Sequence, residues 1–118
     1  MDEETFKSRT KKLAVAIIKE VNTLPRSVVA DVIGKQLVRS GTSIGANYRA
    51  ACRAKSTADM INKMKIVEEE SDETEYWLEL LVEAGIISQS QIADIYKETD
   101  EILAMTVSSI KTLRNRRS

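Results

Sequence analysis

Apolar residues recur along this chain at intervals of three and four positions, the spacing that places side chains on one face of an α-helix. The pattern predicts four helices, and no stretch shows the strict alternation typical of a β-strand. The helices are expected over residues of about 5–24, 27–54, 57–84 and 89–113. Because the connections are short, we expect an all-α, antiparallel up-down-up-down four-helix bundle, formed by a single domain of residues 1–118.

The second predicted helix contains one doubtful segment, from Ser40 to Gly45. Two glycines in it weaken a helix by roughly 1 kcal/mol each relative to alanine, so a break with a restart at Thr42 or Ser43 is one interpretation. The apolar stripe keeps its phase across the segment, which favours one continuous helix. The small side chains would then let a neighbouring helix approach closely.

Capping signals mark the ends of the later helices. Ser56 is placed to cap the third helix, and Gly85 is placed to end it. Ser88 and Gln91 have the spacing of a capping box at the start of the fourth helix. The tail of residues 114–118 is predicted to fray beyond that helix.

Composition excludes many catalytic classes. The chain has no histidine and one cysteine, Cys52, so imidazole-dependent hydrolases, His-ligated zinc sites and internal disulfides are excluded. We therefore expect no enzyme, no cofactor and no metal site. The longest apolar run, Leu13–Ile18, is far shorter than a membrane span, and no signal-type stretch follows the first residue. These features predict a cytoplasmic protein without a membrane partner.

The formal net charge is zero, but the charge is unevenly distributed. Residues 26–55 carry six basic groups against one acid, a net of +5, whereas residues 56–87 carry two basic groups against nine acids, a net of −7. One interpretation is that the basic and acidic helices pair with each other or face solvent. The other is that the basic helix forms a surface that attracts phosphates.

This uneven charge distribution indicates contacts between the two helices and candidate binding residues. Glu68 and Glu75 flank the polar centre of the third helix, where their spacing directs them toward Arg39 or Asn47. The sequence favours Tyr48, Tyr76 and Trp77 as core or interface anchors over base-stacking platforms. Tyr48 beside Arg49 is the one position where ring stacking would combine with charge. The candidate nucleic-acid-binding residues are the basic groups near the end of the second helix and in the C-terminal tail. These are Arg49, Arg53, Lys55, Arg114, Arg116 and Arg117.

Three stretches of the chain carry a resemblance to a known family. They are residues 36–51 (QLVRSGTSIGANYRAA), 56–63 (STADMINK) and 73–81 (ETEYWLELL). Together they resemble the bacterial four helix bundle proteins associated with 23S rRNA intervening sequences, and the chain is also similar to accessory variability proteins of diversity-generating retroelements. The family pattern often has an acid where Ala50 stands.

The resemblance implies a four-helix bundle, a ring-shaped homopentamer and association with RNA or with a nucleic-acid-processing protein. It implies no catalytic residues. It also implies helix-packing or intersubunit positions for Arg39, Asn47, Glu75 and Trp77. We therefore expect a non-enzymatic RNA-binding or ribonucleoprotein-associated accessory protein. The alternative is a protein–protein scaffold whose charges serve oligomerisation and partner docking.

Overall fold

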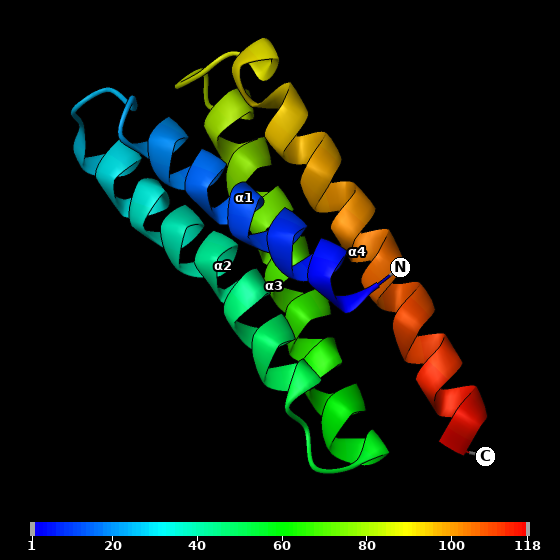
Figure 1. Cartoon of the computed structure of the whole chain (residues 1–118). Helices are drawn as coiled ribbons and strands as arrows, with labels where there is room; N and C mark the ends of the chain where they lie inside the picture. The colour runs from blue at the N-terminus through cyan, green and yellow to red at the C-terminus, as the bar shows by residue number, and fades with distance from the viewer. Residues whose placement is uncertain (1, 118) are drawn as a thin grey trace.

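Four long helices run antiparallel and form the predicted bundle, as a computed structural model shows (Figure 1). The structure describes residues 2–117, with side chains as far as Arg116. The helices are α1 (Glu3–Val21), α2 (Val28–Cys52), α3 (Thr57–Glu83) and α4 (Gln89–Arg117). The bundle measures 49 × 21 × 20 Å, so each helix extends along most of its length.

Side chains just outside the helices fix their beginnings. The carboxylate of Asp2 accepts from the backbone N–H of Thr5, so α1 begins earlier than predicted. Ser27 caps α2, and Ser56 caps α3 as expected. Gly85 adopts a φ of +75°, a left-handed conformation that ends α3 at little cost for glycine.

Two predicted helix ends were wrong. The first helix ends at Val21 and not near residue 24, because the backbone N–H groups of Asn22, Thr23 and Leu24 close the last turns before Pro25. At the other end of the chain, the tail does not fray after residue 113, since α4 continues to Arg117. No proline or glycine follows Gly85 in the sequence, so nothing in the last segment interrupts the helix.

α2 is continuous through its two central glycines, as the unbroken stripe predicted. A methyl group added at Gly41 would lie 2.5 Å from Cδ1 of Ile17 on α1. One added at Gly45 would lie 3.1 Å from the hydroxyl oxygen of Thr10. The glycines therefore cost α2 some helix propensity but allow α1 to pack against its backbone.

The core is a stack of aliphatic side chains with a layer of hydroxyl groups. The hydroxyls of buried threonines and serines donate mainly to backbone carbonyls of their own helices, which satisfies them without a partner helix. Thr74 and Ser40 differ, because their hydroxyls lie 2.9 Å apart and join α3 to α2. The fully buried polar side chains include Thr10, Ser40, Ser71, Thr74, Thr99 and Thr106.

α1 and α4 close the bundle through its smallest helix–helix interface. Arg9 of α1 donates to Glu98 at 2.6 Å and to Glu101 at 2.9 Å, both on α4. These bonds raise the pKa of Arg9 and lower the pKa of Glu98. Past this contact α4 runs on beyond the start of α1, so the C-terminus projects at that end of the bundle (Figure 1).

Candidate nucleic-acid interface

A shallow groove follows the line where α1 packs against the C-terminal half of α2. Its floor consists of small residues, among them Ala14, Gly45 and Ala46, in a hollow of about 660 Å³. A second hollow shares residues with it, and a third shares Ala50 and Arg53 with the second and extends the surface past the end of α2. We call this surface the basic groove, after its basic lining residues Lys7, Lys11, Arg49, Arg53, Lys55 and Lys63.

Helical spacing aligns these cations. Lys7 and Lys11 are four residues apart on α1, and Arg49 and Arg53 are four apart on α2, so each pair lies on one helix face. The two faces meet along the groove because Gly45 brings α1 close to α2. The fold thus joins cations from both helices in one surface.

Most of the groove cations are free to bind an anion. Lys7 pairs with Glu3 at 3.2 Å, and this contact raises the pKa of its ammonium group. Among the described residues, the other five groove cations form no ion pair with an acid of the chain. Two acids, Glu4 and Asp59, also line the groove, so its six cations exceed its carboxylates and leave a net positive charge over a floor of small side chains.

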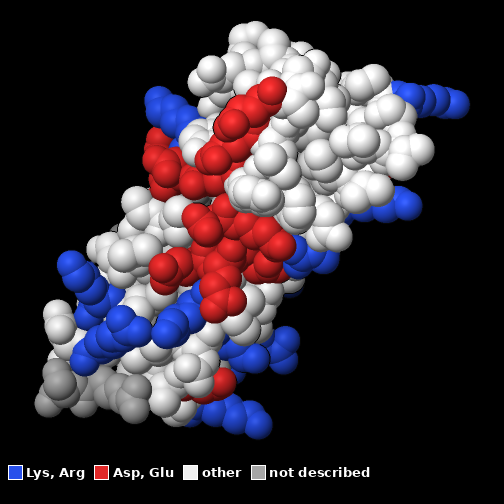
Figure 2. All heavy atoms as spheres, turned by 180° about the vertical axis from the view of Figure 1, so that it is seen from behind, with Lys and Arg blue, Asp and Glu red and all other residues white. Residues whose placement is uncertain are grey.

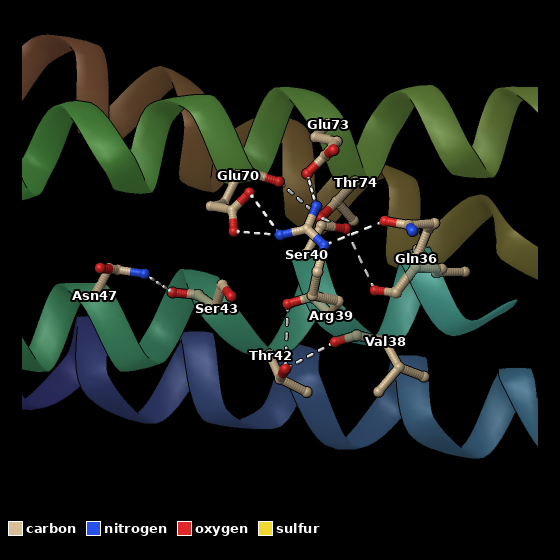
Figure 3. A network of polar contacts seen from close by, with 11 residues as sticks. Gln36, Val38, Arg39, Ser40, Thr42, Ser43, Asn47, Glu70, Glu73 and Thr74 are labelled. Atoms are coloured by element: carbon tan, nitrogen blue, oxygen red, sulfur yellow. Dashed lines mark hydrogen bonds and ion pairs between the residues drawn. The ribbon is translucent and has the colours of Figure 1, made fainter. Parts of the chain in front are cut away.

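Arg39 has the opposite environment, although it lies on the same basic helix. Its guanidinium donates to Glu70 at 3.0 Å and to Glu73, both on α3 (Figure 3). The hydrogen bond to Glu73 is the main cause of the raised pKa of Arg39. The sequence had directed Glu68 and Glu75 toward this residue, and that prediction was wrong.

The error came from the rotation of α3 about its axis. Residues 70 and 73 lie on the flank that faces α2, whereas residues 68 and 75 lie on the opposite flank, toward α4. Asn47 also makes no contact with an acid, since its amide donates to the Ser43 carbonyl of its own helix at 2.9 Å (Figure 3).

Glu75 lies instead in an acidic cluster between α3 and α4. Its side chain is buried, one of its oxygens has no hydrogen-bond partner, and its nearest charged neighbours are Asp100, Asp72 and Glu79. Burial, and then the neighbouring Asp100, raises the pKa of Glu75 to about 7. Figure 2 shows acidic side chains gathered across the middle of this face.

Two aromatic residues take structural positions. Tyr48 is 5% exposed, and its ring centroid lies 4.3 Å from that of Phe6, so it is a core residue, which is the interpretation that the sequence favoured over a stacking platform. Trp77 is half-buried on α3, where its indole N–H is buried without an acceptor. Its ring meets that of Tyr76 edge-on.

The structure divides the predicted nucleic-acid-binding residues into two groups. Arg49, Arg53 and Lys55 line the basic groove. Arg114 and Arg116 are exposed on the last turns of α4, and Arg116 lines a separate hollow at the same end of the bundle. The side chain of Arg117, which completed the prediction, lies outside the described residues.

The lysines that complete the groove were not among the predicted binding residues. Lys7 and Lys11 have the four-residue spacing of a basic face, but the neighbouring acids reduce the net charge of residues 1–25 to +1. Lys63 lies on the acidic helix and contributes to the groove because it is close to the start of α3. The four-residue spacing of Lys7 and Lys11 indicated a basic helix face, but the low net charge of residues 1–25 concealed it.

Within residues 2–117, cysteine, aspartate and glutamate side chains form no group of three or more that could hold a metal ion. In the same part of the chain, no helix is both long enough and apolar enough to cross a membrane.

Comparison with known families identifies the relatives of this bundle. The model of the 23S rRNA-intervening sequence protein family matches residues 4–108. The chain belongs to this family. A search of curated proteins gave no match.

A solved structure extends the family relationship to the complete bundle. It is the crystal structure of a protein of unknown function from the S23 ribosomal protein family of Bacteroides thetaiotaomicron. The two chains are 41% identical, and they superpose with a TM-score of 0.87 over 94% of this chain and 99% of the other.

Proposed function

We propose that this protein is a non-enzymatic RNA-binding accessory protein of the cytoplasm, which uses the basic groove to hold the phosphate backbone of a structured RNA. The observation that carries the proposal is the row of unpaired cations along one groove, to which α1, α2, α3 and the connection after α2 contribute. The family description, which refers to 23S rRNA intervening sequences, supports ribosomal RNA as the partner.

The groove suits a phosphate backbone for two reasons. Its floor of alanine and glycine offers no bulky side chain, so a sugar–phosphate chain can approach the helices closely. Its arginines can donate two parallel hydrogen bonds to a phosphate, while its lysines act as point charges. This combination predicts backbone recognition with little selection of sequence.

Salt dependence gives a quantitative expectation. Each phosphate contact releases condensed counterions, so the logarithm of affinity falls with the logarithm of salt concentration. If the five unpaired groove cations each contact one phosphate, the slope is roughly −3 to −5. Binding by the groove should therefore weaken strongly between low and physiological salt.

The test measures binding of a structured RNA by fluorescence anisotropy across a salt series. The double variant Arg49→Glu and Arg53→Glu should weaken binding at least tenfold and reduce the slope by about two. The matched control, Arg26→Glu with Lys35→Glu, makes the same charge change at the other end of α2. Equal affinity of the groove variant and the unmodified protein would show that the groove does not bind the RNA.

A second proposed role is oligomerisation into a homopentamer that acts as a scaffold for protein partners. Specific observations favour contacts with protein: Val28, Val29 and Val32 are exposed together at the start of α2, Val28 by 80%. The acidic face of α3 and α4 is also complementary in charge to the basic groove of a second copy.

The mass of the protein in solution distinguishes a homopentamer from a monomer. Light scattering should give five times the mass of one chain, and the mass of a monomer would contradict the ring. Pulldown with and without nuclease then distinguishes the two roles. Partners that survive nuclease treatment favour the scaffold, and partners lost with the RNA favour the RNA-binding protein.

A further inference from the structure

α4 extends further than α1 at the end of the bundle that carries the C-terminus. The side chain of Arg9 contacts Glu98, Glu101 and Met105 of α4, and Met105, at 3.6 Å, is the nearest of these to the C-terminus. From Arg9, α1 continues for six residues to its first residue, Glu3. From Met105, α4 continues for twelve residues to its last, Arg117. At 1.5 Å per residue, α4 extends about 9 Å beyond the start of α1, and the fourth corner of the bundle is vacant there (Figure 1).

The vacant corner forms a hollow of about 640 Å³ with a mixed lining. Its floor is apolar and flexible, since three methionines, Met60, Met64 and Met105, reach it from α3 and α4. Its α4 wall carries hydroxyl groups, with an arginine at the end of the helix. These wall residues are Ser108, Ser109, Thr112 and Arg116, with the apolar Leu113 among them, and Glu3 of α1 adds a carboxylate to the lining.

This lining indicates the chemistry of an occupant. A nucleobase has two apolar faces and a polar edge, and thioether groups beside hydroxyl groups match both. Arg116 would meet the phosphate of the same nucleotide. An apolar helix from another protein would contact the methionines and Leu113, but it would also cover the hydroxyl groups of α4 and the charged groups of Glu3 and Arg116 without offering them partners.

The hollow borders the basic groove. Tyr48 lines the hollow, and the next residue, Arg49, lines the groove. On α1, Glu3 lines the hollow, and its ion-pair partner Lys7 lines the groove. One turn of α1 therefore separates the two surfaces, and a strand that follows the groove passes the mouth of the hollow.

From this arrangement we infer that the hollow receives one unpaired nucleobase of an RNA whose backbone lies in the basic groove. The inference rests on the proposed function and adds a preference to it. The protein binds RNA that carries an unpaired base more tightly than continuous duplex, because a base in a duplex must first be unstacked.

The test compares two RNA hairpins that differ by a single unpaired adenine in the stem. The hairpin with the unpaired base should bind about tenfold more tightly at equal salt, which is within the usual effect of one inserted base. In protein labelled with ¹³C at the methionine methyl groups, the signals of Met60, Met64 and Met105 should shift with this hairpin and not with the paired one.

Variants on α4 test the location. Thr112→Trp fills the hollow from its solvent side, so it should abolish the preference and leave binding of the paired hairpin unchanged. Val107→Trp is the control, because Val107 is exposed on the same helix and does not line the hollow. Circular dichroism establishes that both variants fold.

The outcomes distinguish the inference from the proposed function. Equal binding of the two hairpins with unshifted methionine signals overturns the inference while the groove retains its role. A preference that persists in Thr112→Trp also overturns it. If neither hairpin binds, the proposed function and the inference fall together, and methionine shifts seen only with an amphipathic peptide assign the hollow to a protein.

Discussion

Replacement of Glu75 by glutamine should stabilise the protein at alkaline pH and have little effect under acid conditions. In the folded chain the carboxyl group is buried beside Asp100, with one oxygen unpartnered, and its pKa rises from 4.5 to about 7. The folded state thus holds this proton more tightly than the unfolded state. Its contribution to stability is complete below pH 4.5 and is lost as the pH rises through 7.

The size of the effect follows from the shift. One pKa unit corresponds to 1.36 kcal/mol, so the loss between acid and alkaline pH is at most roughly 3 kcal/mol. Glutamine has the same shape and no charge, so the variant avoids this loss. We expect Glu75→Gln to exceed the unmodified protein by about 1–3 kcal/mol at pH 8 and by much less at pH 5.

Urea unfolding at pH 5 and pH 8, at fixed protein concentration and salt, measures this difference. The control is Glu69→Gln, which removes an exposed carboxylate from the same helix and should change stability equally at both pH values. A Glu75→Gln effect of the same size at pH 5 and pH 8 would refute the argument, because it would show that ionisation of this carboxyl group costs the fold nothing.

Two further predictions concern the packing of the helices and are measured by urea unfolding at neutral pH. Gly41→Ala should destabilise the protein by about 1 kcal/mol, since the clash with Ile17 outweighs the gain in helix propensity; an increase in stability would contradict the close approach. Ser40→Ala and Thr74→Val should each cost about 1 kcal/mol, and the double variant should cost about 0.5–1 kcal/mol less than the sum, because both remove one interhelical hydrogen bond. Strict additivity would mean that the two hydroxyls do not interact.

The fold was predictable because its determinants are local. The stripe through α3 ends at Gly85, which takes the left-handed conformation that the sequence suggested. The continuity of α2 was predictable from the phase of its apolar positions. The length of α4 was less predictable, because the charged tail resembles a frayed end and the helix continues through it.

The candidate site was predictable only in part, because it depends on how the helices are rotated. Successive residues of a helix differ by about 100° in direction, so an offset of two residues turns a side chain to the other side of the helix. The predicted partners of Arg39, Glu68 and Glu75, are each two residues from its actual partners, Glu70 and Glu73. The basic residues of α2 were found from charge density. The basic residues of α1 could be assigned to the groove only once it was known which face of α1 meets α2.

The order of contacts along the bundle has a consequence for how the chain folds. Each large helix–helix interface joins neighbours in the sequence, α1 with α2, α2 with α3 and α3 with α4, while α1 meets α4 least. Chains dominated by such local contacts lose little loop entropy before their contacts form, and they fold within microseconds to milliseconds. We therefore expect the seam between α1 and α4, held by Arg9, to close last and to open first in the native state.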